Sequence, residues 1–436
     1  MNYAETLDYL FTKLPMFTRV GPSAYKADII NIQKLCERLG NPHQEFKTIH
    51  VAGTNGKGSV SHMLAATLQV SGYKTGLYTS PHLYDFRERI KINGQMVPEE
   101  FVISFTERIK PLILEIEPSF FEITLAMAFS WFAEQQVDVA VIEVGLGGRL
   151  DSTNIITPEL SIITNIGWDH MNLLGDSLQK IATEKAGIIK QEVPVVIGER
   201  QQEVEEIFMG MAEEKKAPFY FASDHYKVVH AKQTNKLTLS IEDTKKKEVQ
   251  NITLDLPGFY QQKNVCTALQ AINLLQQRGW KISQEDYLSA LSKTKALTGL
   301  HGRWEILQEK PTVILEVAHN KEGLEQMVNN LALLSYHHLH IVFGIVKDKD
   351  ATAILSLLPK EATYYFTQAH IPRALSAADL AIQASPFGLQ GNTFTNVNTA
   401  LEEAFKHASE DDVIIVCGSI FLVSEVNKEA LVKCAL

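Results

Sequence analysis

A glycine-rich segment carrying one lysine, Gly53–Ser59, is the first part of the sequence that could do chemistry. Glycines let the backbone turn tightly and aim N–H groups at a phosphate, and a following helix adds partial positive charge. Lys57 would bring a full charge to the β- and γ-phosphates of a nucleotide, and the Ser59 hydroxyl could bind Mg²⁺. The common Walker pattern is not strictly met, because Gly58 separates Lys57 from Ser59. A turn with an incidental lysine is the alternative.

Two more candidates follow apolar stretches further along the chain. Glu143 ends a nearly continuous apolar run and precedes the glycine-rich loop Gly145–Asp151, and Asp169 and His170 follow the next apolar run. A buried, unpaired carboxylate is too costly to persist, so Glu143 is either a paired structural charge or a metal ligand. A lone histidine is usually structural. A glutamate and a histidine at corresponding strand ends beside a phosphate loop favour metal binding instead.

Divalent ions are expected here on electrostatic grounds. A carboxylate that approaches the γ-phosphate of ATP meets another anion, and each like-charge pair near 4 Å costs about 4 kcal/mol at an effective dielectric of ~20. One lysine cannot offset several such pairs. Mg²⁺ ions can, because they neutralise phosphate oxygens and position an in-line attack.

The elements that would position these residues are buried strands alternating with helices. Strands are expected at 46–52, 137–144 and 160–166, with a helix from Ser59 to about Val70. Continuous apolar strands separated by helices imply a parallel sheet, and ligands collect beyond the carboxyl ends of such strands. All three strands carry their polar, glycine-rich residues at that end, which places the candidate site there.

The rest of the chain supplies two further regions. The first forty residues are expected to be helical, with one helix over 28–39, and a small antiparallel excursion is expected over 226–256, followed by a helix over 263–277. After Thr298 the strand–helix alternation restarts. Its expected strands are 313–318, 340–344, 363–367 and 412–417, with a helix over 322–334.

The predicted fold class is therefore α/β. A P-loop-containing domain with a central, mostly parallel sheet and the small antiparallel excursion would span residues 1–297. A smaller, Rossmann-like α/β domain would span 298–436. At 436 residues the chain is long enough for two such domains.

Composition narrows the class of protein. A net charge of −10 argues against non-specific nucleic-acid binding. The four cysteines (Cys36, Cys266, Cys417 and Cys434) are scattered, which suggests neither a disulfide framework nor a zinc site. Glu5 and Asp8 interrupt the N-terminus, so no secretory segment is expected there, and no apolar run approaches the ~20 residues that span a bilayer. We expect a cytoplasmic protein without membrane partners.

At these residues the sequence resembles the folylpolyglutamate synthase/dihydrofolate synthase family, a branch of the Mur ligase superfamily. The resemblance covers nearly the whole chain. The matching segments in the first domain are Gly53–Ser59, Thr79–Leu83, Phe121–Thr124, Glu143–Asn154, Asp169–His170 and Glu184–Ile189. Later matches are Gly258, Gln261, Asn264, Gly302–Arg303, Ala318–Asn320, Gly344, Asp348–Asp350 and Gly418–Ser419. The most specific element is Glu143–Asp151.

The resemblance implies roles for individual residues. The nucleotide would be bound by Asn55, Gly56, Lys57, Gly58, Ser59, Asn264, Arg303 and Glu316. One Mg²⁺ would be held by Ser59, Ser80 and Glu143, and a second by His170 together with a carbamylated Lys185. The pterin-bearing substrate would contact Phe121, Glu122, Ile123, Thr124, Leu150, Asp151 and Ser152. Lys57, His170 and Lys185 would be the catalytic residues. Carbamylation needs a neutral amine, which a desolvated site provides.

The sequence departs from the family pattern at several positions. Glu316 and Val317 stand where aspartate and glycine are usual before Ala-His-Asn, Lys321 replaces the usual proline, and Tyr260 replaces a histidine. Glu316 could still accept hydrogen bonds from nucleotide hydroxyls. In isolation, Glu184–Gly187 reads as a charged helix turn, Ser80 as a turn residue and His319 as a core or cap histidine.

The function that the resemblance implies is an ATP-dependent ligase that adds L-glutamate to folate or dihydropteroate through an acyl phosphate. Dihydrofolate synthesis, polyglutamate extension or both fit this expectation, and the enzyme would act as a monomer. One alternative is a Mur-type ligase acting on a cell-wall nucleotide precursor. Another is a P-loop NTPase that serves as a switch or binding module, which would leave Glu143, His170 and the second domain without a role.

Overall fold

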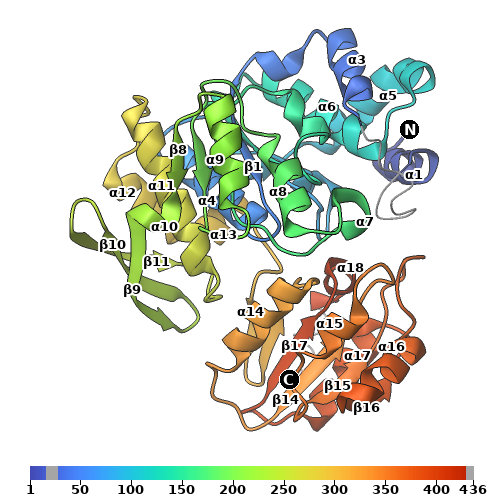
Figure 1. Cartoon of the computed structure of the whole chain (residues 1–436). Coiled ribbons are helices and arrows are strands. Elements are labelled where there is room, and N and C mark those ends of the chain that lie inside the picture. The colour runs from blue at the N-terminus through green and yellow to red at the C-terminus, as the bar shows by residue number, and fades with distance from the viewer. Residues whose placement is uncertain (16–27, 429–436) are drawn as a thin grey trace. The chain divides into compact units, whose positions relative to one another are not determined.

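The computed structural model describes residues 1–15 and 28–428, and within them the chain forms two compact units (Figure 1). Unit 1 comprises the described residues up to Asp255 together with Tyr260–Leu300. Unit 2 comprises the short segment Leu256–Phe259 and the chain from His301 onward. Part of the expected N-terminal helical region, residues 16–27, lies outside the described residues, as does Cys434.

The core of unit 1 is an eight-stranded sheet in the order β4-β3-β2-β5-β1-β6-β7-β8. The strands from β2 to β8 in this order pair in parallel, and β3 and β4 form an antiparallel edge. Their bounds are β1 (Lys47–Ala52), β2 (Thr75–Tyr78), β3 (Ile90–Ile92), β4 (Gln95–Met96), β5 (Val139–Glu143), β6 (Leu160–Ile163), β7 (Val195–Ile197) and β8 (Phe219–Phe221). The predicted mostly parallel sheet is confirmed.

Helices cover both faces of this sheet. On one face, Ala140 and Ile142 of β5 pack with α5 and α6, and Ile163 of β6 packs with α8 and α9. On the other face, α4 lies against β1, β2 and β5, and α11 lies against β6 and β7. The helices of unit 1 are α1 (Tyr3–Lys13), α3 (Ile30–Arg38), η2 (Pro42–Gln44), α4 (Lys57–Val70), η3 (Phe86–Arg89), α5 (Glu99–Ile116), α6 (Phe120–Glu134), η4 (Ser152–Ile155), α7 (Met171–Leu174), α8 (Leu178–Ala186), α9 (Glu205–Glu214), α10 (Ala222–His225), α11 (Gln261–Gln277), α12 (Gln284–Leu291) and α13 (Thr294–Thr298).

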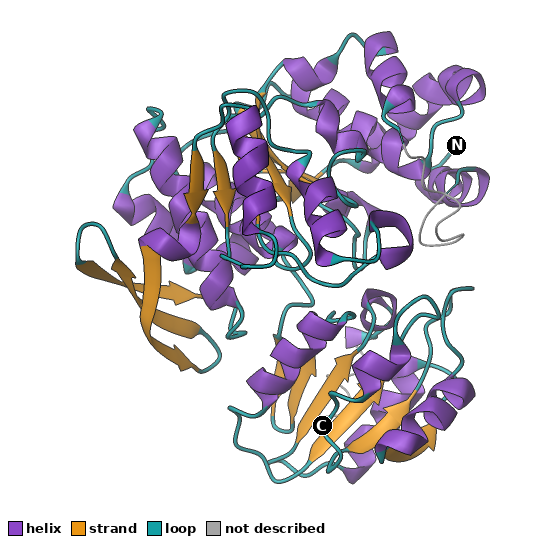
Figure 2. Ribbon diagram, in the orientation of Figure 1, coloured by secondary structure: helices purple, strands orange, loops and turns teal. Residues whose placement is uncertain are grey.

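The antiparallel excursion is a separate three-stranded sheet next to α11 and α12 (Figure 2). Its strands are β9 (Tyr226–Gln233), β10 (Leu237–Asp243) and β11 (Glu248–Leu254). Side chains alternate along β10, where Leu237, Leu239 and Ile241 are buried. One face therefore packs on the helices and the other faces solvent, as the sequence pattern predicts.

The C-terminal end of α13 is anchored to the body of unit 1 by two buried side chains. His62 of α4 contacts the Thr298 hydroxyl with its Nδ1 atom, at 2.7 Å. The ammonium group of Lys91 on β3 donates to the carbonyl oxygens of Thr298 (2.7 Å) and Gly299 (3.2 Å). Unit 1 thus stays tightly packed up to the residues that lead into unit 2.

Unit 2 is built on a six-stranded sheet in the order β12-β13-β17-β14-β15-β16, in which only β12 pairs antiparallel among the described strands. The strands are β12 (Glu305–Glu309), β13 (Thr312–Leu315), β14 (Leu339–Phe343), β15 (Thr363–Phe366), β16 (Gln390–Thr393) and β17 (Val413–Cys417). The helices are α14 (Lys321–Leu331), α15 (Ala351–Leu355), α16 (Ala377–Ala384), η5 (Ser385–Phe387), α17 (Val397–His407) and α18 (Ile420–Ser424).

Several predicted elements differ from the observed ones by a few residues at their ends. The strand expected to reach residue 318 stops at Leu315, because the backbone N–H of Val317 bonds to Gly302 instead of continuing the ladder. The helix expected to reach residue 334 ends at Leu331, where the carbonyls of Val328 and Asn330 accept from the N–H of Ala332. The α/β class of both units is confirmed.

Candidate functional site

The glycine-rich loop connects β1 to α4, and two of its positions can be occupied only by glycine. Gly53 has φ 141° and Gly56, the N-cap of α4, has φ 84°. A Cβ atom on Gly53 would lie 1.8 Å from Oγ1 of Thr164, and one on Gly56 would lie 2.3 Å from Oδ1 of Asn264. Backbone conformation and crowding therefore both require glycine at these two positions. The predicted strand–loop–helix unit is present.

Two lysine ammonium groups meet at this loop. Nζ of Lys57 donates to the carbonyl oxygens of Gly53 (3.1 Å) and Thr54 (3.2 Å). Nζ of Lys185, at the end of α8, also donates to the Gly53 carbonyl, at 3.0 Å. The loop thus brings two lysine amines to one carbonyl oxygen, four residues before the start of α4.

Lys185 is buried, and its charge is destabilised there. Burial and the neighbouring Lys57 lower the pKa of Lys185 to about 7, while Asp169 and Asp151 oppose that shift. A large fraction of this lysine is therefore neutral near neutral pH, as carbamylation requires. These electrostatic partners also show that residues following β1, β5 and β6 come together around Lys185.

Glu143, at the carboxyl end of β5, lies next to the Ser80 backbone. Its Oε2 accepts a hydrogen bond from the Ser80 N–H at 3.1 Å, and the residue is only 5% exposed. Val51 is its register partner on β1, two residues before the phosphate loop. The predicted metal ligand Glu143 and the predicted phosphate loop thus lie on adjacent strands.

A hydrogen-bonded chain links α11 to the start of α4. The side-chain amide of Gln261 donates to Oγ of Ser59 at 3.1 Å, and Asn264 donates to Oε1 of Gln261 at 2.8 Å. Gly58 and Ser59 are buried in the first turn of α4. This network holds the Ser59 hydroxyl, and it places Asn264 beside Gly56, as a nucleotide-binding role for both would require.

His170 follows β6 in a left-handed backbone conformation, with φ 51°. Its N–H donates to Oδ1 of Asp169 at 2.8 Å, and its Nε2 lies 3.8 Å from the other carboxylate oxygen. The loops after β1 and β6 are also joined directly. The N–H groups of Thr54 and Asn55 donate to Asn165, and Thr54 is bonded to Gly167.

The chemistry of these donors fits Mg²⁺. No cluster of three or more His, Cys, Asp or Glu residues suited to a metal occurs within residues 1–15 and 28–428. The predicted ligands instead combine one carboxylate (Glu143), one imidazole (His170) and the hydroxyls of Ser59 and Ser80 with Lys185, which would bind in carbamylated form. Mg²⁺ prefers hard oxygen ligands and is typically bound through one or two carboxylates, waters and substrate phosphates.

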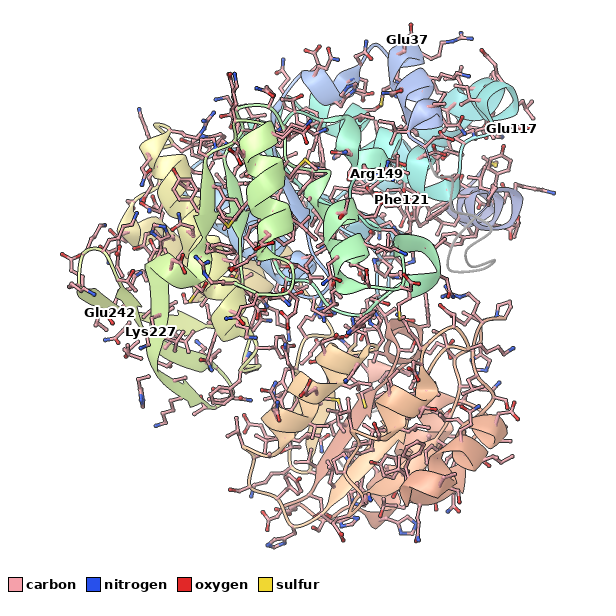
Figure 3. The ribbon with its side chains drawn as sticks, in the orientation of Figure 1. Glu37, Glu117, Phe121, Arg149, Lys227 and Glu242 are labelled. Carbon is pink, nitrogen blue, oxygen red and sulfur yellow. The ribbon has the colours of Figure 1, made fainter. Side chains whose placement is uncertain are left out.

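The predicted substrate residues on α6 have different environments. The Phe121 ring lies over Gly145, where a Cβ atom would come within 2.6 Å of Cζ, and Ile123 is fully buried. The Thr124 hydroxyl lies 3.2 Å from the Tyr78 hydroxyl. Glu122 completes a helix cap by accepting from the N–H and hydroxyl of Ser119. Figure 3 labels Phe121 on α6.

The loop after β5 is held by the ion pair of Arg149 and by Asp151. Arg149 pairs with Glu184 at 2.8 Å, and its N–H donates to the Glu184 carbonyl (Arg149 is labelled in Figure 3). Leu150 is half-buried and Ser152 is buried. Asp151 is enclosed, and burial raises the pKa of its carboxyl group against several opposing hydrogen bonds.

Sequence reasoning did not single out the partners of Asp151. Its Oδ2 accepts from the Leu146 N–H at 2.8 Å, and its Oδ1 accepts from the N–H and hydroxyl of Thr153. Nε2 of His50, on β1, lies 2.8 Å from the Thr153 hydroxyl. Burial lowers the pKa of His50 to about 3, so this histidine is neutral. Nothing in the local sequence marks a strand histidine as such a partner.

A second residue that sequence reasoning missed is Arg89, at the end of η3. It is 4% exposed, and its Nε donates to Nδ1 of His82 at 2.8 Å. Burial lowers the pKa of Arg89, and burial together with the Arg89 charge lowers the pKa of His82 to about 3. In the sequence Arg89 resembles Arg87, which is half-buried and paired with Asp85.

The predicted site residues of unit 2 contact backbone groups of the same unit. The Glu316 carboxylate accepts from the backbone N–H groups of Trp304 (2.9 Å) and Ala318 (3.1 Å), which ties the residue before β12 to the segment after β13. Nη1 of Arg303 lies 3.4 Å from the Gly302 carbonyl oxygen, and Nδ1 of His319 lies 2.9 Å from that of Val317.

Comparisons with known proteins agree with this architecture. The Mur ligase middle domain matches residues 51–272, and the Mur ligase, glutamate ligase domain, matches residues 302–420. The dihydrofolate synthase/folylpolyglutamate synthase of Bacillus subtilis is 33% identical over 413 residues, which cover 92% of this chain and 95% of that protein. This chain belongs to the folylpolyglutamate synthase/dihydrofolate synthase family of Mur ligases.

Other family members agree in sequence and structure. The folylpolyglutamate synthase of Lacticaseibacillus casei is 32% identical over 448 residues, covering 99% of each chain. The structure of Escherichia coli FolC in complex with DHPP and ADP is 30% identical, with a TM-score of 0.86, and covers 100% of this chain and 98% of that one. This family member is thus an ATP-dependent ligase, and the predicted family and two-domain fold are confirmed. No helix among the described residues is long and apolar enough to cross a membrane.

Proposed function

We propose that this folylpolyglutamate synthase/dihydrofolate synthase family member uses ATP and Mg²⁺ to couple L-glutamate to a folate-type acid. The observation that carries the proposal is the convergence of Lys57 and Lys185 on the Gly53 carbonyl, beside the strand-terminal Glu143. Relatives named as dihydrofolate and folylpolyglutamate synthases, and a neighbouring structure that contains DHPP and ADP, support the same substrate class.

On the nucleotide side, the backbone of Asn55–Ser59 and the charge of Lys57 would hold the triphosphate at the N-terminus of α4. Asn264 would contact the nucleotide next to Gly56. Arg303 and Glu316 are proposed nucleotide contacts from unit 2. The Glu316 carboxylate is held in place by the two backbone bonds that it accepts from the N–H groups of Trp304 and Ala318.

Ser59, Ser80 and Glu143 would hold one Mg²⁺, and His170 with carbamylated Lys185 would hold a second. Bound Mg²⁺ neutralises phosphate oxygens and so lets an anionic nucleophile approach. A neighbouring structure from Yersinia pestis contains AMPPNP and a Mn ion, in agreement with nucleotide and divalent-metal use. The lowered pKa of Lys185 favours the neutral amine that carbamylation consumes.

On the substrate side, Phe121, Leu150 and Ser152 would line the pterin pocket with Ile123 and Thr124 behind them. Asp151 would offer an acceptor to the pterin, and Glu122 would contribute by capping α6. Gly145 lets the Phe121 ring approach the loop closely. The pocket would therefore begin beside the loop that follows Glu143.

The proposed reaction has two steps. A carboxylate oxygen of the acid attacks the γ-phosphorus, the bond to the β-phosphate oxygen breaks, and ADP leaves with an acyl phosphate formed. The glutamate amine then attacks the acyl carbon, loses a proton, and phosphate leaves with an amide formed. Activation is needed because a free carboxylate is a poor electrophile, and positioning with electrostatics supplies most of the acceleration.

A ligation assay tests this function. Purified protein, ATP, Mg²⁺ and labelled glutamate would be incubated with dihydropteroate, a reduced monoglutamyl folate or a UDP-linked acid. We expect amide product with one or both folate-type acids, and ADP release that depends on the acid. Product with the UDP-linked acid alone, or ATP hydrolysis independent of any acid, would contradict the proposal.

Two further expectations have their own tests. Light scattering would test the expected monomeric state, and subcellular fractionation would test the expected cytoplasmic location.

A further inference from the structure

Arg89 is a buried cation without an acidic partner. It is 4% exposed, and no carboxylate of the described residues lies within ion-pair distance of it. Its neighbour Arg87, two residues earlier, pairs with both Asp85 (2.7 Å) and Glu99 (3.2 Å). Because a buried charge is stable only when it is paired or hydrogen-bonded, Arg89 is the more costly of the two arginines and calls for an anion.

The groups that do surround the Arg89 guanidinium are neutral. Nε donates to Nδ1 of His82, which must therefore present a lone pair, and the Phe120 ring lies 5.3 Å from Cζ. The Tyr78 hydroxyl lies close enough to the guanidinium to act on it electrostatically. A guanidinium has five N–H donors, and the hydrogen bond from Nε to His82 uses one of them, so the donors on Nη1 and Nη2 are available to a ligand. The carboxylates of Glu143 and Glu88 act on Arg89 only through their longer-range field.

The position of Arg89 connects the two halves of the proposed site. Its carbonyl accepts from the Thr79 N–H, so it lies beside the Ser80 backbone that contacts Glu143. On its other side, Tyr78 contacts the Thr124 hydroxyl and lies with its ring 6.0 Å from that of Phe121. The guanidinium thus lies between the proposed metal ligands and the proposed pterin pocket.

We propose that Arg89 binds the carboxylate of the acid substrate, the group that is phosphorylated. This inference rests on the proposed function and assigns to that site the residue that holds the reacting anion. Arginine suits the task because its planar fork can bond both oxygens of a carboxylate. Arg89 would also offset the repulsion between that carboxylate and the triphosphate.

A binding experiment with a charged and a neutral ligand tests the assignment. Calorimetry would compare 7,8-dihydropteroate with its methyl ester in the presence of Mg²⁺ and ADP, for the wild type, Arg89→Met and the matched control Arg87→Met. We expect the wild type and Arg87→Met to prefer the acid, and Arg89→Met to lose about tenfold to a hundredfold of that preference, as for a charge-assisted hydrogen-bonded pair. Affinity for the ester and for Mg²⁺·ADP should stay within about threefold of the wild type.

Two results would overturn the inference. One is a wild-type protein that binds the ester as tightly as the acid, which needs no variant to observe. The other is an Arg89→Met protein that keeps the preference for the acid but loses Mg²⁺·ADP binding, because Arg89 would then act through Glu143. Where Arg89→Met fails to fold, Arg89→Lys replaces it as the test variant. Lysine retains the charge but not the planar guanidinium, so this variant should keep part of the preference for the acid over the ester. The glutamate-ligation assay reports separately on the proposed function.

Discussion

Charged side chains behave differently in two regions of unit 1. On the small sheet β9–β11, Lys227 is exposed and faces Glu242 across β9 and β10 (both labelled in Figure 3). At the carboxyl ends of β1, β5 and β6, Lys185 and Glu143 are enclosed, and the pKa of Lys185 falls to about 7. Solvent screens charges of the first kind, whereas enclosed charges act strongly on one another and on a ligand. Burial of charge therefore separates the functional edge of the sheet from a solvated surface.

The largest effect is expected for Lys57→Ala. Removing the cation that faces the phosphate loop should lower kcat/KM for glutamate ligation by about a thousandfold or more, because the charge acts on the transferred phosphoryl group. Circular dichroism and the melting temperature should stay close to those of the wild type. Turnover near the wild-type level would remove the phosphate-loop assignment.

Lys185 should give stability a dependence on pH that Lys185→Met lacks. The pKa of this lysine is about 7 in the folded protein against an ordinary value of 10.5, so between these values the unfolded chain binds more protons. The free energy of unfolding of the protein without carbamylation should therefore rise with pH in this window, by up to about 1.4 kcal/mol per pH unit. The free-energy cost of burying the charged Lys185 amine is largest below pH 7. Urea unfolding in bicarbonate-free buffer at pH 7.5 and 9 measures this. Parallel changes in wild type and variant would contradict it.

Thr153→Val should destabilise the protein by about 1–3 kcal/mol, because it removes one of the donors to the buried Asp151 carboxylate and leaves the buried Nε2 of His50 without its hydrogen-bond partner. Thr153→Ser keeps the hydroxyl and serves as the control. Urea unfolding at pH 7 would compare the two. A valine variant as stable as the serine variant would show that this buried chain contributes nothing measurable.

Lys227→Ala should change the least. Its ammonium group lies on the solvated face of β9, so we expect a change in the free energy of unfolding within about 0.5 kcal/mol and unchanged ligation kinetics. A loss of activity in this variant would mean that the small sheet takes part in function, and the contrast between the two regions would fail.

The sequence predicted the phosphate loop and the strand ends because their signals are local. Gly53 and Gly56 are needed by backbone geometry, and Glu143 stands out at the end of an apolar run. The spacing of Ser119 and Glu122 also matches the capping box that begins α6, so this contact is local in the sequence too.

The remaining residues could not be found in this way, because burial and pairing depend on the fold. Arg87 and Arg89 are alike in sequence, yet one has two acidic partners and the other has none among the described residues. His50 reads as one residue of a strand, and only the folded position of η4, which packs against α3 and α6, brings Thr153 to it.

The most direct test of the central claim is a crystal structure with AMPPNP and Mn²⁺, in which anomalous scattering locates the metal. We expect the triphosphate over Gly53–Ser59, with Lys57 on its phosphates and a Mn²⁺ ion bound by Ser59, Ser80 and Glu143. A triphosphate bound away from this loop, or a metal that contacts neither Glu143 nor His170, would contradict that claim.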